Sequence, residues 1–254
     1  MKQVRFIPFD SCGLSIREDG EGQESRTIEG TPIVFGVRSV NLTPWSETRE
    51  VYEVLEPGCI TQELINRSDV ILNLNHSSLV PDVLGRCRNG QGTLALELNE
   101  KNIGCRCDIA KTPNADAALE LMRRGDITGM SFAFSDDYQD SENGVSYERT
   151  DEKTEDGKEV WLRHVKRITG LYDVSIVTHP AYEQTSVGTR EASDEIDKAI
   201  DEQLKREAGQ ETEEQKKARE AKEREERELE EQAERAREMQ MMRLRSQRRH
   251  LDWK

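Results

Sequence analysis

The segment 125–134, GDITGMSFAF, carries the clearest strand pattern in the chain. Its large apolar residues alternate, so in a strand their side chains all face a core: Met130, Phe132 and Phe134. The small residues between them face the other side, which leaves Ser131 flanked by a glycine and an alanine. Because small side chains allow another backbone to come close, the pattern predicts a strand that presents an approachable serine.

A helix is predicted immediately before this strand. Thr112 can cap its N-terminus, Pro113 suits the first helical position, and Gly125 ends it. The predicted apolar stripe of this helix consists of Ala117, Ala118, Leu121 and Met122.

The rest of the body consists of short alternating or apolar stretches bounded by turn residues, which is typical of strands. These stretches are 1–9, 27–35, 50–55, 70–74, 92–98, 104–109 and 160–177. Between the last two predicted strands, residues 135–159 are polar and predict a hairpin or an excursion from the body. Residues 1–188 therefore predict one mostly β domain of the α+β class.

Residues 189–254 differ sharply from the body. They contain no proline and one glycine, Gly209, and they carry long runs of glutamate, arginine and lysine. Such runs favour helix and many ion pairs four residues apart, but the apolar positions are too sparse for a regular heptad seam. We expect a charged helical tail, either a solvated single helix or a weak coiled coil.

Overall composition excludes several classes of protein. The net charge is −14, and residues 191–254 contribute only −4 of it, so the body itself is acidic and does not suit nucleic-acid binding. The five cysteines and the absence of a secretory h-region at the start predict reduced thiols. No apolar run reaches about 18 residues, so no membrane span is expected.

Serine-based acyl transfer needs a base, and the body offers three histidines: His76, His164 and His179. His76 follows a short apolar strand in NLNHSS, and His164 lies in the charged stretch WLRHVKR. Each of these residues, like Ser131, also has an ordinary structural interpretation when taken alone. Local sequence therefore names the candidates without choosing among them.

Taken together, NHSS, GDITGMSFAF and LYDVSIVTHPAYEQTSV resemble the prohead serine proteases of tailed bacteriophages. The earlier segments IEGTPIVFG and EVLEPGCI also resemble that family, and the likeness spans roughly residues 25–188. The family resembles the herpesvirus assemblins, so the resemblance implies an assemblin-like antiparallel β-barrel with a few flanking helices, followed here by the charged tail.

The resemblance also implies roles for individual residues. Ser131 matches the nucleophile and His76 the histidine of the family. Asp173, the residue immediately before VSIV, stands where the family tends to carry an acid and could orient His76. His179 is the rival third member, because assemblins use a second histidine there.

The implied function is a serine endopeptidase that cleaves the scaffold or the capsid-protein precursor, and itself, during prohead maturation. It requires no cofactor, no metal, no direct nucleic-acid contact and no membrane, and it places the protein in the host cytoplasm, inside the assembling prohead. Residues 188–210 are the expected region of self-cleavage. Assemblins are activated by dimerisation, so a homo-oligomer is left open.

Two alternatives stay open at this stage. Cys105 and Cys107, with Cys87 and Cys59, could suggest zinc, but a single intervening residue does not suit a zinc knuckle, and two such thiols in a strand more simply point into a core. The chain could also be a non-enzymatic capsid scaffolding protein, or a protease–scaffold fusion, because its tail is similar in composition to scaffolding segments.

Overall fold

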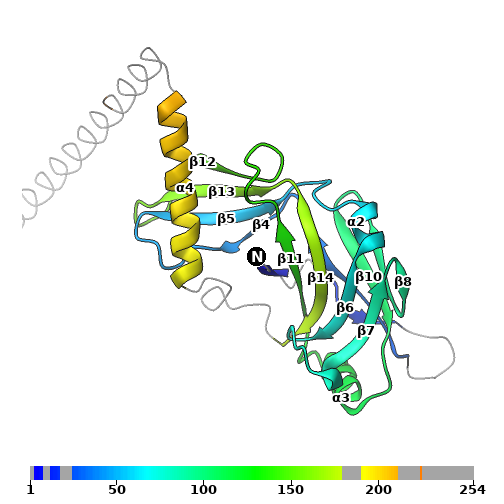
Figure 1. The fold of residues 1–254 in the computed structure, drawn as a ribbon. Coiled ribbons are helices and arrows are strands. Elements are labelled where there is room, and N and C mark those ends of the chain that lie inside the picture. Colours follow the sequence, from blue (N-terminus) through cyan, green and yellow to red (C-terminus); the bar gives the residue numbers. More distant parts are fainter. Residues whose placement is uncertain (1–2, 8–11, 18–24, 179–189, 211–223, 225–254) are drawn as a thin grey trace, which may run out of the picture. The chain divides into compact units, whose positions relative to one another are not determined.

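A computed structural model describes residues 3–7, 12–17, 25–178, 190–210 and 224. The chain divides into two compact units, residues 1–199 and 200–254. The first unit contains all the strands of the described part (Figure 1). The predicted domain boundary between residues 188 and 189 stays a prediction.

The strands in the described residues form three sheets. In the six-stranded sheet the order is β1 (Gln3–Ile7), β11 (Gly129–Asp136), β14 (Ile168–Val177), β6 (Asp69–Leu74), β7 (Val83–Arg88) and β8 (Gln91–Gly92). The second sheet has the order β2 (Ser15–Ile16), β3 (Thr27–Val34), β10 (Asn102–Asp108) and β9 (Leu94–Leu98). The third has the order β12 (Val145–Lys153), β13 (Glu159–Val165), β5 (Arg49–Leu55) and β4 (Arg38–Asn41).

The mostly β class with few helices is confirmed, but the expected antiparallel barrel is not what the described strands form. They make three separate sheets, and none of these closes on itself. Two neighbouring pairs are parallel, β6 with β14 and β5 with β13. Closing the six-stranded sheet would require its edges to pair, yet β8 has only two residues and β1 only five.

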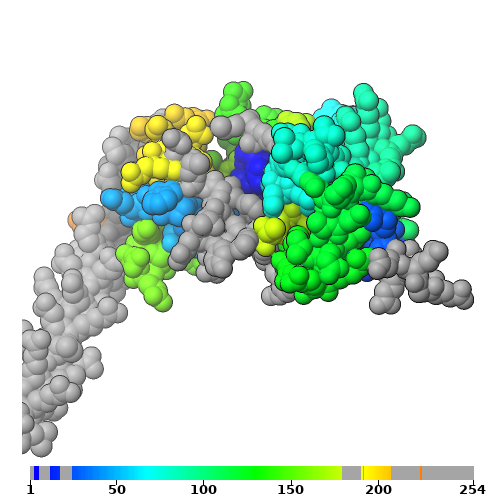
Figure 2. All heavy atoms as spheres, turned by 90° about the horizontal axis from the view of Figure 1, so that it is seen from below, coloured from blue at the N-terminus to red at the C-terminus, as the bar shows by residue number. Residues whose placement is uncertain are grey.

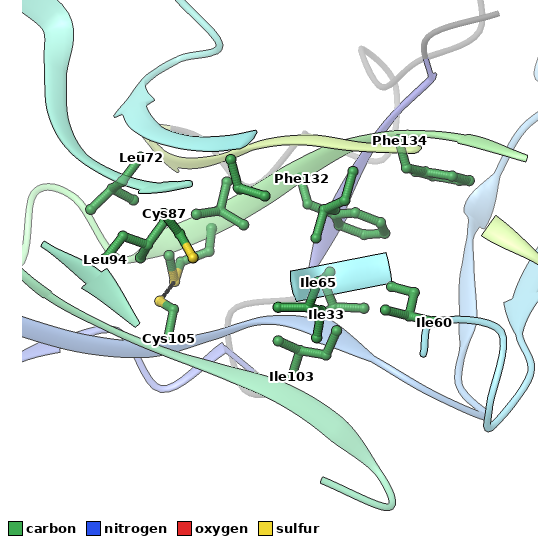
Figure 3. Close-up of a cluster of buried hydrophobic side chains, with 14 of the residues drawn as sticks. Ile33, Ile60, Ile65, Leu72, Cys87, Leu94, Ile103, Cys105, Phe132 and Phe134 are labelled. Carbon is green, nitrogen blue, oxygen red and sulfur yellow. Dashed lines mark hydrogen bonds between the residues drawn. The ribbon is translucent and has the colours of Figure 1, made fainter. Parts of the chain in front are cut away.

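The main core lies between the six-stranded sheet and the second sheet. Figure 3 shows Phe132 and Leu72 of the first sheet facing Ile33, Ile103 and Cys105 of the second. Helix α2 (Gln62–Arg67) adds Leu64 and Ile65 to this core; Thr61 caps its N-terminus through a 3.1 Å bond from the amide of Leu64. The alternation in GMSFAF therefore buries its large residues as predicted.

The helix predicted before β11 is α3 (Pro113–Arg123). Thr112 caps it as expected, accepting a bond from the amide of Ala115 at 3.3 Å. The buried stripe is rotated from the predicted one: Ala115, Ala118 and Leu119 are buried, whereas Ala117 is exposed. Figure 2 shows this helix, in green, on the surface, which explains why only a narrow stripe is covered.

Two further helical elements have described bounds, a single 3-10 turn at Val80–Asp82 and α4 (Arg190–Gln210). The polar segment expected as a hairpin contains β12, which pairs with β13. α4 includes the first part of the predicted helical tail, and of residues 211–254 the structure describes Arg224 alone. Within the part of the chain that is described, no helix combines the length and apolarity needed to cross a membrane.

Candidate active site

Ser131 lies in the middle of β11, between β1 on one side and β14 on the other. Across the ladder to β14, Ser131 stands opposite Ser175 and Ala133 stands opposite Asp173. Directly opposed residues share a face of the sheet, so Ser131, Ser175 and Asp173 all lie on the face away from Phe132. This is the arrangement that the alternating pattern of both strands predicts.

One residue of β14 departs from that pattern. Strict alternation along LYDVSIV would put Tyr172 on the core face with Val174 and Ile176, but Tyr172 is 42% exposed. The register shifts there, because Ala133 pairs with Asp173 while Phe134 pairs with Leu171. This β-bulge leaves Tyr172 out of the ladder and puts Leu171 in the core, while Asp173 stays on the face of Ser131.

His76 is presented by a sharp turn at the end of β6. Asn75 and His76 both have left-handed backbone conformations, with φ of 49° and 57°. Asparagine tolerates this region, but histidine does so at a cost of about 1–2 kcal/mol. Such a conformation persists only where its surroundings hold it, and it is found most often at functional sites.

Hydrogen bonds from β14 hold this turn in place. The amide of Asn75 donates to the carbonyl of Ile176 at 3.0 Å, and the amide of His76 donates to the hydroxyl of Ser175 at 2.9 Å. The hydroxyl of Ser175 in turn donates to the side-chain oxygen of Asn73. Because β6 and β14 are parallel neighbours, the end of β6 meets β14 beside Ser175, and the turn carries His76 back over the sheet.

The turn joins the three candidate side chains in a hydrogen-bonded series. Nδ1 of His76 lies 2.5 Å from Oδ1 of Asp173, and Nε2 lies 2.6 Å from Oγ of Ser131. The Asp173 side chain is 5% exposed and that of His76 16% exposed. A carboxylate at Nδ1 selects the tautomer whose bare Nε2 can accept a proton from a serine hydroxyl, which is the proton transfer that acyl transfer needs.

Of the other two candidate histidines, His164 does not join this series. His164 lies on β13, in the third sheet, where its Nδ1 is 2.6 Å from Oε1 of Glu56. An ion-paired structural role for it agrees with its charged sequence context. His179 lies outside the described residues, so the choice between it and Asp173 rests on the contact that Asp173 makes.

Sequence reasoning missed three residues around Ser131. Ser175 and Asn73 brace the histidine turn, and Arg5 of β1 places its carbonyl oxygen 2.7 Å from the hydroxyl of Ser131. The parity of Ser175 in YDVSIV already placed it beside Asp173. Nothing in the local sequence of Arg5 connects it to a serine 126 residues away.

The cysteines act as small core side chains. All five are reduced and buried, and Cys105 and Cys107 point the same way from β10, as their spacing predicts. No group of three or more cysteine, histidine or acidic side chains suited to a metal occurs in the ranges that the structure describes. The zinc alternative therefore finds no ligand set there.

Burial raises the pKa of Cys59, Cys105 and Cys107 to about 12 in each case. At pH 8 the thiolate fraction of such a group is about 10³-fold lower than that of a free cysteine. We expect iodoacetamide to modify these three residues at least that much more slowly in the native protein than in guanidinium chloride, as measured by mass spectrometry of their peptides. Rapid native modification of any of them would contradict their burial.

Comparison with known proteins identifies the family to which this chain is similar. Residues 13–200 match the model of the caudovirus prohead serine proteases. A solved structure, that of the capsid assembly protease of bacteriophage T4, aligns with a TM-score of 0.36 and 11% identity, covering 67% of this chain and 96% of that one. No curated protein gives a significant match.

The family match spans well over half of the chain and contains Ser131, His76 and Asp173. It also contains both parallel strands that hold the histidine turn. The chain therefore belongs to the caudovirus prohead serine protease family.

Proposed function

We propose that Ser131 is the nucleophile, His76 the general base and Asp173 the orienting acid of a phage capsid-maturation endopeptidase. Family membership makes the chain a serine peptidase of prohead maturation. The observation that carries the residue assignment is the series of contacts Asp173–His76–Ser131, at 2.5 and 2.6 Å.

The steps follow from these contacts. His76 takes the hydroxyl proton through Nε2 while Oγ of Ser131 forms a bond to the peptide carbonyl carbon. The tetrahedral intermediate then breaks the C–N bond, and the leaving amine receives the proton from His76. Water, deprotonated by the same imidazole, releases the acyl group from Ser131, and the hydroxyl regains its proton. Asp173 stays ionised and stabilises the imidazolium that forms during both acylation and deacylation.

The strained turn supports this assignment. A histidine that only filled space would gain nothing from a left-handed conformation that costs about 1–2 kcal/mol. Three separate contacts maintain it: two from Ser175 and Ile176 of β14, and one from the amide of Thr178, just after the strand, which donates to Asn75 at 3.2 Å. We infer that the strained conformation is retained because it directs Nδ1 of the imidazole to Asp173 and Nε2 to Ser131.

The substrates proposed are the capsid-protein precursor, a separate scaffold, and the protease itself, all within the assembling prohead in the host cytoplasm. The charged tail, residues 189–254, suits a tether to the scaffold or capsid interior, which would raise the effective concentration of enzyme near its substrate. A protease–scaffold fusion is the form of the alternative function that this tail favours.

Incubation of the purified chain with the capsid-protein precursor of its own phage tests the function. We expect new N-termini in the precursor and trimming of the protease within residues 188–210, both identified by mass spectrometry. The matched reaction contains the Ser131→Ala variant, which should leave both proteins intact. If the wild-type chain leaves the precursor and itself intact and a fluorophosphonate probe does not label Ser131, the non-enzymatic scaffolding alternative replaces the proposal.

A further inference from the structure

Ser131 is fully buried, although a nucleophile must reach a substrate. Its residue exposure is 0%. On one side β14 continues the sheet, and on the other β1 pairs antiparallel with β11, with Phe6 opposite Ser131 and Arg5 opposite Phe132. Of these two neighbours, β14 carries Asp173 and belongs to the site. A peptide can reach β11 in its place in the sheet only where β1 now lies.

β1 has the properties of a bound peptide. It is a five-residue edge strand, and it lies outside residues 13–200, the region shared with the family. An extended peptide that adds to a sheet edge makes the same backbone ladder. Figure 1 shows the N-terminal strand beside β11, at the edge of the six-stranded sheet.

The contact at Ser131 blocks the proton transfer. The hydroxyl donates to the carbonyl oxygen of Arg5 at 2.7 Å, and Nε2 of His76 lies 2.6 Å from the same Oγ. A hydroxyl has one proton, so a serine that donates to Arg5 cannot at the same time donate to His76. While β1 is in place, the proton is directed away from the base.

The side chain of Arg5 fills a buried site for a cation. Its Nε and Nη2 donate to the two carboxylate oxygens of Glu53 at 2.6 and 2.8 Å, and Arg5 is only 8% exposed. Arg163 binds both Glu53 and Asp136, and the guanidinium of Arg5 also lies 5.4 Å from the centre of the Phe134 ring. These contacts fix a planar, bidentate cation, which favours arginine over lysine.

The charges of this site require an occupant. Glu53 and Asp136 are buried and Arg163 contacts them both, whereas Arg5 contacts Glu53. Removal of Arg5 therefore leaves two buried carboxylates with one buried cation. In addition, Oδ1 of Asp136 is buried and has no hydrogen-bond partner among the described residues. A buried carboxylate that loses its cation is strongly unfavourable, so the site selects for a cationic side chain on the strand that pairs with β11.

We propose that β1 is an internal pseudosubstrate, and that Glu53, Asp136 and Arg163 form the subsite for an arginine of the peptide substrate. Because the carbonyl beside Ser131 belongs to Arg5, this arginine is the residue on the amino side of the scissile bond. The inference rests on the proposed role of Ser131. It agrees with the expected self-cleavage region, since residues 188–210 contain Arg190 and Arg206.

Displacement of β1 tests the proposal. In the Arg5→Glu variant a carboxylate faces Glu53, so we expect β1 to leave and a fluorophosphonate probe to label Ser131 about 30-fold faster or more than in wild type. The matched control is Arg17→Glu, which makes the same charge change at a side chain that is 44% exposed. Equal labelling rates in wild type and Arg5→Glu would overturn the pseudosubstrate.

A synthetic peptide of residues 1–10 supplies the second arm. It should bind the Arg5→Glu, Ser131→Ala double variant in fluorescence anisotropy, and an Arg5→Ala peptide should bind about 30-fold more weakly or worse. If Arg5→Glu lowers the melting temperature and the peptide neither binds nor restores it, β1 is a permanent part of the fold and the inference is wrong.

The two arms separate this inference from the proposed function. Fluorophosphonate labelling that persists in Ser131→Ala would overturn the nucleophile assignment, and with it the pseudosubstrate. If labelling depends on Ser131 but the Arg5→Ala peptide binds as tightly as the peptide of residues 1–10, Ser131 remains the nucleophile and the arginine subsite is wrong. The N-terminal products of the precursor digest should end in arginine. If no product has a C-terminal arginine, the arginine subsite is also wrong.

Discussion

The Ser131→Ala variant is expected to cleave the capsid precursor at least about 10⁴-fold more slowly than wild type, because the nucleophile of a triad cannot be replaced by its partners. The measurement is the initial rate of product formation by quantitative mass spectrometry. The fold should survive, since alanine fits a strand position that already has small neighbours. The lost hydrogen bond to Arg5 costs about 1 kcal/mol.

Ser135→Ala is the matched control for this variant. Ser135 also lies on β11, but its hydroxyl contacts Thr169 and Tyr172 rather than a histidine. We expect wild-type cleavage rates from it and a similar melting temperature. Cleavage by Ser131→Ala at the rate of the Ser135→Ala control would exclude Ser131 as nucleophile.

The Asp173→Asn variant should lower kcat by about 10⁴-fold with little change in KM, as expected for an acid that sets the histidine tautomer. Asparagine keeps the size of the buried side chain, so the His76 turn should remain in place. The side-chain amide of the introduced asparagine would donate to Nδ1 of His76, and this contact favours the tautomer with its proton on Nε2. In that tautomer Nε2 cannot accept the proton of Ser131. The measurement is a saturation curve with a peptide cut from the mapped cleavage site.

His179→Ala distinguishes the two candidates for the third member. If Asp173 orients His76, the His179→Ala variant should retain most of its kcat. The Ser131→Ala, Asp173→Asn double variant should be no slower than Ser131→Ala, because residues that act as a unit are not additive. A large loss in His179→Ala with little loss in Asp173→Asn would reverse the assignment.

Local pattern predicted much of the fold. Alternation in GMSFAF placed Phe132 in the core and Ser131 on the opposite face, and Thr112 with Pro113 marked the start of α3. These features depend on neighbouring residues, so they can be read from a short window. Strict alternation fails at Tyr172, which is exposed because a bulge shifts the period of β14. The bulge arises in the pairing of β14 with β11 and has no local sequence signal.

Sheet arrangement was harder to predict. Assemblin resemblance implied an antiparallel barrel, whereas the described strands form three sheets with two parallel pairs. Strand pairing depends on segments far apart in the chain, and alternation does not say which strands become neighbours. The parallel pairing of β6 with β14 is the case that matters most, because it brings the end of β6 beside Ser175.

The sequence by itself determined which residue types could form a site: a serine among small residues, a histidine after an apolar strand, and an acid of the right parity. Only the tertiary structure decided that they meet. His76 is 55 residues from Ser131 and 97 from Asp173, and a strained turn held by β14 aims its ring at both. The burial of Ser131 against the carbonyl of Arg5 also depends on strand pairing. Backbone hydrogen bonds between strands can join segments far apart in the chain, and no local sequence pattern marks which segments will pair.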